Sequence, residues 1–262
     1  IMSLTWTSWL TNTIQSDVYF LINTLSQPNP IKQFYINDWI EEAFPIYRGT
    51  ALSHLSSVSP WLVKVKPSQY SHLGQVLDTM PLGDNSWGWA YHSQLDWRTQ
   101  ITHWQKHQLV IMNDKKVIFR FFDARIARTL LPKLSLGDWA VLMMPVDDCL
   151  IEGDEVNENH TRPQYADPFI SPVDYELREH LITAWRDSEQ AYVNVINNFY
   201  IQFWEKQSEL AYQLDEVDGR LIGFIRDWMD ECQKNRLDTA YLYDDLFLRY
   251  LNKNNLLPDM TI

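Results

Sequence analysis

Short apolar runs alternate with amphipathic stretches through the first half of the chain, up to about residue 152. The runs 17–23, 61–67 and 85–93 are rich in β-branched and aromatic residues, which is typical of strands. The stretches 69–80 and 94–108 carry the wider apolar spacing of amphipathic helices. We therefore expect mixed α and β structure in this half.

Alternation within two of these strands predicts which side chains share a face of the sheet. Trp61, Val63 and Val65 alternate with other residues, which predicts a half-buried strand. In the run 85–93 the alternating side chains are aromatic, and we expect them on one side, facing a core: Trp87, Trp89 and Tyr91.

A hairpin follows the second amphipathic stretch. The apolar runs 109–112 and 115–122 are joined by the polar pair Asn113-Asp114, a short turn suited to two antiparallel strands. Two helices and a last strand are expected after it, over 124–131, 135–143 and 145–151.

The pattern changes after residue 152. Residues 153–170 are polar and acidic, with two prolines, which indicates a linker or a long surface loop. Helical spacing begins at Ser171, a good N-cap followed by Pro172 at the first helical position, and we expect a break near Asp187. The predicted fold class is α+β: a mixed αβ lobe with a small sheet (1–152), the acidic linker (153–170) and an all-helical lobe (171–262).

One helix of the predicted C-terminal lobe carries aromatic residues on more than one face. These side chains point from more than one face of the helix, so a core on one side cannot easily bury all four: Phe199, Tyr200, Phe203 and Trp204. An exposed aromatic face is typical of a protein-binding surface. Candidate partner-binding residues are Tyr200, Phe203 and Trp204.

Composition and charge limit the possible functions. Hydrophobic residues make up 45% of the 262 residues, enough for a large core. The formal net charge of −12 repels phosphate, so we expect neither nucleic acid nor an anionic membrane surface as a partner. The N-terminal stretch has no basic region and no long apolar run, which argues against a signal peptide or membrane span. Cys149 and Cys232 are expected to be buried thiols of a cytoplasmic protein.

Asp123 stands where the predicted strand 115–122 gives way to the helix 124–131. Aspartate is among the best N-caps, because its carboxylate accepts the free N–H groups of the first turn. Arg120 and Arg125 are close enough to pair with it. A cap needs no substrate, and its loss in Asp123→Ala should lower stability by about 1 kcal/mol. The alternative is a catalytic Asp–Arg pair.

The residues offer little support for an active site. His103 and His107 are four positions apart on a predicted helix, but the glutamate and third ligand of a metalloprotease pattern are missing. There is no Gly-x-Ser-x-Gly motif, and only 8 glycines, none in a phosphate-binding loop. We therefore expect no catalytic residue, no cofactor and no metal. The alternative is a metal-assisted or Asp/Arg-based hydrolase centred on Asp123, Arg125 and His92 or His103.

Several short motifs occur in a fixed order between residues 18 and 151. FRFFDARI (119–126) is followed by LLPKL (130–134) and LMMP (142–145), and preceded by YRGT (47–50), SPWLV (59–63) and the pair Trp87-Gly88. This order resembles the bacterial family called domain of unknown function 4123, the adaptors or chaperones of type VI secretion effectors. Its usual motifs are FRFYDPRV, LPTL, FFGP, LFxGT, APYLV and WG.

The chain departs from that family at several positions. Ala124 replaces a proline that would fix the first helical residue, Met143-Met144 replaces an aromatic-glycine step, and residues 104–107 replace a leucine-arginine pair. The resemblance implies a non-enzymatic adaptor that binds the N-terminal region of one cognate effector toxin. The adaptor would then deliver this toxin to the VgrG spike or a tip protein. It also implies that Arg120, Asp123 and Arg125 are family signature residues with a structural role.

Overall fold

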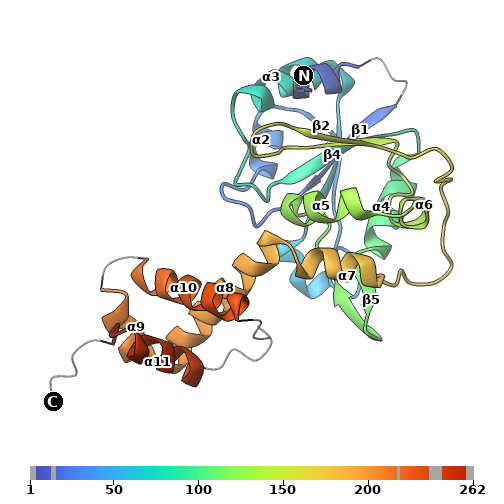
Figure 1. Ribbon diagram of the computed structural model, residues 1–262. Coiled ribbons are helices and arrows are strands. Elements are labelled where there is room, and N and C mark those ends of the chain that lie inside the picture. The colour runs from blue at the N-terminus through green and yellow to red at the C-terminus, as the bar shows by residue number, and fades with distance from the viewer. Residues whose placement is uncertain (1–3, 13–15, 217–218, 236–243, 258–262) are drawn as a thin grey trace. The chain divides into compact units, whose positions relative to one another are not determined.

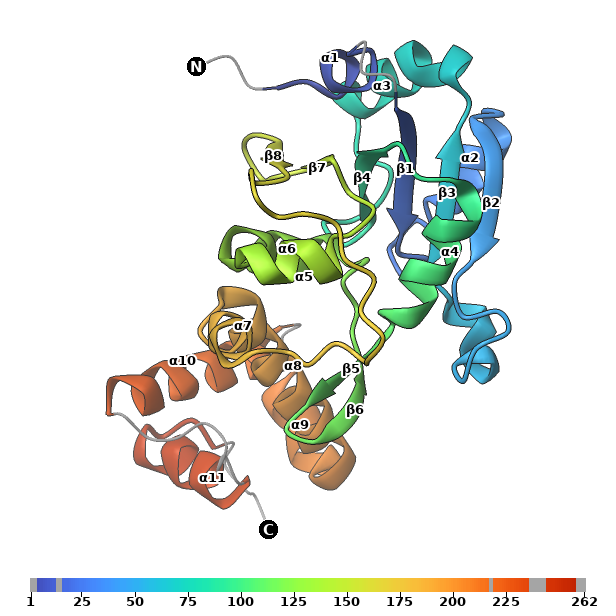
Figure 2. The ribbon, with the colours of Figure 1, turned by 90° about the vertical axis from the view of Figure 1, so that its right-hand side faces the viewer.

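The computed structural model describes residues 4–12, 16–216, 219–235 and 244–257 and is shown in Figures 1 and 2. The chain divides into two compact units between Trp185 and Arg186. The first unit is mixed α and β, and the second is helical, so the predicted α+β class is confirmed.

An antiparallel sheet forms the centre of the first unit. Among the described residues it has six strands in the order β2-β3-β1-β4-β7-β8, and each pair of neighbouring strands is antiparallel. A separate hairpin pairs β5 with β6 through Asn113 and Asp114, which both have positive φ, and this predicted hairpin is confirmed. The strands are β1 (Asp17–Ile22), β2 (Ile40–Pro45), β3 (Trp61–Val65), β4 (Gly88–Ser93), β5 (Leu109–Met112), β6 (Lys115–Ile118), β7 (Asp148–Ile151) and β8 (Glu158–Thr161).

Helices supply a core to each face of this sheet. One core takes side chains from α1 (Trp6–Leu10), α2 (Ile31–Ile36) and α3 (Tyr70–Thr79). The opposite core takes them from α4 (Trp97–Lys106), α5 (Ala124–Leu130), α6 (Leu136–Leu142) and α7 (Glu179–Arg186). Three short 3-10 helices complete the unit: η1 (Ser53–Val58), η2 (Pro67–Gln69) and η3 (Leu131–Lys133).

Trp61, Val63 and Val65 of β3 share the core of α1 to α3, as their alternation predicts, but β3 is buried on both faces, so the predicted half-buried strand is wrong. Leu62 belongs to one core and Val63 to the other, and both are fully buried. Lys64 holds its amine 3.0 Å from Asp17 and 3.2 Å from Glu41. A long cation can reach the edge of a covered sheet in this way while its stem stays buried.

Gly88 explains why the predicted aromatic face of β4 is split. Trp89 and Tyr91 lie in the core of α4 to α7, whereas Trp87 lies in the opposite core. The φ of Gly88 is +142°, and a Cβ added there would lie 2.1 Å from the carbonyl oxygen of Leu21. Only glycine fits this conformation and this close approach, and the turn reverses the side on which the preceding residue emerges.

The segment predicted as a linker contributes a strand to the sheet. β8 pairs with β7, placing His160 opposite Cys149, although its sequence ENHT is polar. Ser171 does not cap a helix, because its Oγ accepts a hydrogen bond from the Val173 N–H and α7 begins only at Glu179. The helical region therefore starts later than predicted.

Residues 175–177 connect this segment to the strand β5 of the hairpin. The N–H of Ile111 donates to the Tyr175 carbonyl at 2.9 Å, and the N–H of Leu177 donates back to the Ile111 carbonyl at 2.8 Å. These bonds extend the β5 edge of the hairpin, and Leu181 of α7 lies fully buried in the core of α4 to α6. The boundary between units consequently falls at residue 185, and not at 152 or 171 as predicted.

The second unit is built from helices around an aromatic core. The break predicted near Asp187 is confirmed, because α7 ends at Arg186 and Ser188 caps the next helix. Phe247 is fully buried, with its ring 5.0 Å from Trp228 and 5.2 Å from Phe203. The described helices are α8 (Glu189–Lys206), α9 (Ser208–Leu214), α10 (Arg220–Lys234) and α11 (Asp244–Lys253).

Two further predictions concern single residues and membrane segments. Cys149 and Cys232 are both buried free thiols, as expected. Burial raises the pKa of each above its ordinary value, with the neighbouring acidic residue adding to the effect. Among the helices that the structure describes, none combines the length and apolar character that crossing a membrane requires.

Candidate functional site

Asp123 caps the helix α5, as the sequence predicts. Its backbone is extended, with φ −76° and ψ 117°, and its Oδ1 accepts a hydrogen bond from the Arg125 N–H at 3.1 Å. The strand β6 ends earlier than predicted, at Ile118, and the aromatic residues that follow it turn into the core. Phe121 is held there by its carbonyl oxygen, which accepts from the Trp89 indole at 2.8 Å.

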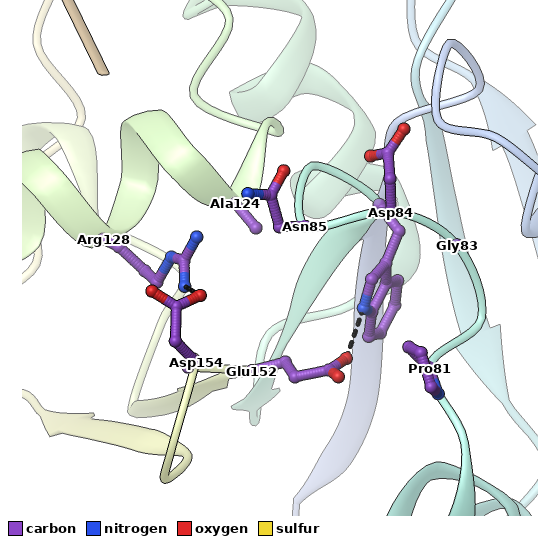
Figure 3. Close-up of a pocket in the computed structure, with 10 residues that line it drawn as sticks. Pro81, Gly83, Asp84, Asn85, Ala124, Arg128, Glu152 and Asp154 are labelled. Atoms are coloured by element: carbon purple, nitrogen blue, oxygen red, sulfur yellow. Dashed lines mark hydrogen bonds and ion pairs between the residues drawn. The ribbon is translucent and has the colours of Figure 1, made fainter. Parts of the chain in front are cut away.

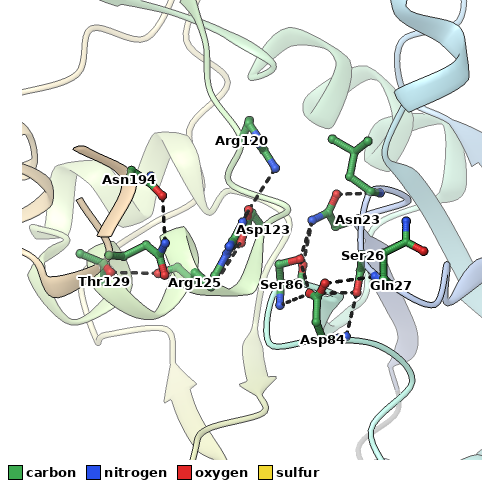
Figure 4. Close-up of polar contacts among 12 residues, drawn as sticks. Asn23, Ser26, Gln27, Asp84, Ser86, Arg120, Asp123, Arg125, Thr129 and Asn194 are labelled. Atoms are coloured by element: carbon green, nitrogen blue, oxygen red, sulfur yellow. Dashed lines mark hydrogen bonds and ion pairs between the residues drawn. The ribbon is translucent and has the colours of Figure 1, made fainter. Parts of the chain in front are cut away.

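Two arginines enclose the capping carboxylate (Figure 4). Arg125 binds it with two nitrogens, Nε to Oδ1 at 3.0 Å and Nη2 to Oδ2 at 2.8 Å. Arg120 adds a third contact, Nη2 to Oδ2 at 3.1 Å. The two-nitrogen geometry is the strong form of an arginine–carboxylate pair, and hydrogen bonding to Asp123 raises the pKa of Arg125.

The burial of this cluster is unequal. The Asp123 side chain is 1% exposed, whereas those of Arg120 and Arg125 are 40% and 30% exposed. Each carboxylate oxygen already accepts two hydrogen bonds from these neighbours. A general base or nucleophile must offer a lone pair to its substrate, so this geometry favours a structural role for Asp123.

A pocket of about 240 Å³ lies beside the start of α5 (Figure 3). Its acidic groups are engaged with neighbours: the Trp87 indole donates to Glu152 at 2.6 Å, and Arg128 pairs with Asp154 at 3.1 Å. The pocket is lined by Pro81, Gly83, Asp84, Asn85, Trp87, Ala124, Arg128, Glu152, Gly153 and Asp154.

Asp84 organises the loop on the other side of this pocket. It accepts from the Oγ and N–H of Ser86, from the Gln27 N–H and from the Ser26 hydroxyl (Figure 4). Burial opposes its ionisation, but these hydrogen bonds outweigh burial and lower the pKa of Asp84 below its ordinary value. The carboxylate therefore stays ionised and fixes two segments that are far apart in sequence.

The histidines of the hydrolase alternative lie apart from Asp123. His92, on β4, contacts Asp148 through Nδ1 at 2.5 Å and lies 4.1 Å from the Trp9 ring. His103, on α4, bonds the Leu142 carbonyl through Nε2 at 2.9 Å. No hydrogen bond or ring contact between the described residues joins either histidine to Asp123. The described part of the chain also holds no group of three or more His, Cys, Asp or Glu side chains placed to bind a metal.

Asp138 is a buried carboxylate that the sequence reasoning missed. It forms a capping box with Ser135 at the start of α6 and accepts from the Tyr175 hydroxyl at 2.7 Å and His180 at 2.9 Å. Burial opposes its ionisation, but the hydrogen bonds from Ser135 and Tyr175 lower its pKa. The Ser-x-x-Asp spacing of 135 and 138 was the available local signal, since it is the pattern of a capping box.

The aromatic residues proposed for partner binding differ in exposure. Phe203 is fully buried in the core of the second unit, so the prediction that it lies on an exposed aromatic face does not fit. Tyr200 and Trp204 are half-buried against the same core, and the Tyr200 hydroxyl donates to Asp215 at 3.0 Å. Phe199 and Phe203 lie on the face of α8 that packs into the core, whereas Tyr200 and Trp204 lie at the border of that core.

Comparison with known proteins gives one match. Residues 18–140 match the model of a protein family described as Domain of unknown function (DUF4123). The match includes β1, the hairpin and the capped start of α5, and it supports the resemblance that the motifs indicate. Searches of curated proteins and of solved structures gave no match.

Proposed function

We propose that the chain is a non-catalytic adaptor, a chaperone that binds one cognate type VI secretion effector and loads it onto the VgrG spike or an associated tip protein. The ordered motifs and the family match over residues 18–140 support this proposal. The effector would engage through its N-terminal region, in the cytoplasm, before export.

The observation that carries the proposal is that the three signature residues are hydrogen-bonded to one another. Arg120, Asp123 and Arg125 bind one another, and Asp123 uses both oxygens on these arginines and on the first turn of α5. Residues that are engaged in this way hold a scaffold together. A scaffold that presents a surface is what an adaptor needs, whereas a hydrolase needs a carboxylate available to substrate.

Binding would proceed by burial of protein surface. Specific complexes cover about 1,600 Å² in total, and a few aromatic and arginine anchors supply most of the affinity. Of the anchors proposed from the sequence, Tyr200 and Trp204 remain candidates because both reach the surface of the second unit. Phe203 would contribute indirectly, by holding α8 in place from within the core.

An export experiment in the native host tests the proposal. The gene for this chain is deleted, and the toxin encoded beside it is measured in cells and in the medium. We expect export of that toxin to be lost and restored by the plasmid-borne chain, while export of the spike protein itself continues. Normal toxin export in the deletion strain would contradict the proposal.

A further inference from the structure

A groove separate from the signature residues lies beside the helix α4. Its volume is about 250 Å³, and one wall comes from α4 while another comes from the segment that follows β8. Met144, Phe169 and Ile170 supply apolar surface to it. The full lining is Arg98, Thr99, Thr102, His103, Lys106, His107, Met144, Phe169, Ile170 and Ser171.

The segment after β8 presents large apolar side chains to solvent. Phe169 is 54% exposed and Ile170 is 73% exposed, and nearby Val173 is also exposed. Neighbouring apolar side chains that no core covers are typical of an interaction surface. The groove gives this surface a recess into which a partner can insert.

The backbone of this segment is anchored to the helices α4 and α6 and to Arg162. The Phe169 N–H donates to the Ala140 carbonyl at 2.8 Å, Arg162 donates to the Ala166 carbonyl at 2.8 Å, and Lys106 donates to the Ser171 carbonyl. Exposure of Phe169 and Ile170 is therefore fixed by hydrogen bonds. A surface held in place in this way loses little entropy when a partner binds.

The two histidines that line the groove on α4 and just after it are uncharged at neutral pH. His103 and His107 are each 5% exposed, and burial is the main cause that lowers the pKa of both imidazoles. Two uncharged imidazoles beside the apolar surface of Met144, Phe169 and Ile170 suit an apolar side chain. An engineered cavity of about 150 Å³ holds benzene, so this volume has room for one large aliphatic or aromatic side chain.

The charged residues in the described lining are both cations. Arg98 and Lys106 stand at the groove although the chain as a whole carries a net charge of −12. Lys106 donates to the Ser171 carbonyl, a neutral acceptor that leaves its positive charge at the groove, and it also interacts electrostatically with Asp174. Acidic residues beside the inserted side chain would complement these two cations.

We propose that this groove binds a segment of the effector in which a large apolar side chain stands next to acidic residues. The apolar side chain enters between α4 and Ile170, and the acidic residues pair with Arg98 and Lys106. This inference rests on the proposed function, because the occupant is the effector. It adds the location of the contact and the chemistry of the bound segment.

The test uses two substitutions that match in chemistry and exposure. Ile170→Glu places a carboxylate at the groove, where Ile170 is 73% exposed. Ile36→Glu is the control: it makes the same substitution away from the groove, on α2, where Ile36 is 74% exposed. Arg98→Glu is the third variant. The full-length chain and the effector identified in its native host are purified, and affinity is measured by isothermal titration calorimetry. Unchanged melting temperatures establish that each variant is folded.

We expect Ile170→Glu to weaken effector binding by about tenfold or more, as the loss of a central apolar anchor does. Arg98→Glu should weaken it by roughly threefold or more, with the loss shrinking at high salt. Ile36→Glu should stay within about twofold of the unmodified chain, which is the experimental scatter expected of a neutral surface change.

Three results would overturn the inference, and they are distinguishable. If the effector binds all four proteins equally, the groove is not the docking site, and the proposed function stands. If the effector binds none of them, the proposed function fails together with the inference. If light scattering shows a dimer that Ile170→Glu converts to a monomer, the occupant is a second copy of this chain.

Discussion

Replacing Asp123 tests the structural role of the signature residues most directly. Asp123→Ala removes a helix cap, which costs about 1 kcal/mol, and also removes the partner of two arginines. Breaking a fully buried pair costs about 3 to 5 kcal/mol, but these guanidinium groups are 40% and 30% exposed and regain water. We therefore expect a loss of about 3 kcal/mol, more than the cap alone predicts.

Two control variants separate the contributions. Asp123→Asn keeps the capping oxygen but loses the charge, so it should cost about 2 kcal/mol. Asp154→Ala breaks the pair with Arg128, but the Asp154 side chain is 85% exposed, and surface pairs of this kind contribute about 0 to 1 kcal/mol. The expected order of destabilisation is thus Asp123→Ala, then Asp123→Asn, then Asp154→Ala.

Urea denaturation followed by tryptophan fluorescence measures these differences. Trp204 and Trp228 lie in the second unit, which leaves ten of the 12 tryptophans to report on the first. With a urea dependence of about 2 kcal/mol per molar, a loss of 3 kcal/mol lowers the midpoint by roughly 1.5 M. The reasoning fails if Asp123→Ala unfolds within about 0.5 kcal/mol of the unmodified protein. If stability is kept while a turnover is lost, the hydrolase alternative gains support.

Three further changes follow from burial and backbone geometry. Burial lowers the pKa of His103 and His107, so below pH about 6.5 these histidines take up protons in the unfolded chain but not in the folded one. The free energy of unfolding should therefore be highest above pH 6.5 and fall towards pH 5 by up to about 1.4 kcal/mol per pH unit for each histidine. A variant with both histidines replaced by glutamine should lose this pH dependence. Gly88→Ala should cost about 2 to 4 kcal/mol in urea denaturation because of its positive φ and the carbonyl 2.1 Å from the added Cβ, whereas Gly223→Ala, in open space on α10, should be neutral or slightly stabilising. Phe247→Ala should remove about 3 to 5 kcal/mol from the second unit, and circular dichroism showing an unshifted helical transition would contradict its place in that core.

The features that the sequence predicted correctly depend on neighbours in the chain. Asp123 was identified as a cap because the strand, the aspartate and the helical spacing are contiguous, and the Asn113-Asp114 turn was identified in the same way. The helix break before Ser188 is another local signal. Such features follow from backbone preferences within one or two turns of chain.

The features that the sequence did not predict depend on distant contacts. Asp138 gains Tyr175 from 37 positions later and His180 from 42 positions later, and β8 has a polar sequence whose only strand signal is its pairing with β7. The burial of β3 on both faces depends on helices before and after it in the chain. Local periodicity carries no information about such partners.

The groove beside α4 could not be predicted for the same reason. Its walls come from α4 and from residues near 170, which the sequence assigned to a polar linker. Phe169 and Ile170 are two adjacent large apolar residues in that stretch, and both are exposed while the backbone around them is anchored by hydrogen bonds. Their presence in a polar segment was the available signal.

Purification of the tagged full-length chain from its native host tests the adaptor account most directly, with bound proteins identified by mass spectrometry and their ratio measured. The account predicts one toxin-like protein, encoded beside this chain, recovered at near-equal amounts and lost from the Ile170→Glu variant but not from Ile36→Glu. Recovery of the chain alone, together with a hydrolytic turnover that disappears in Asp123→Asn, would contradict it.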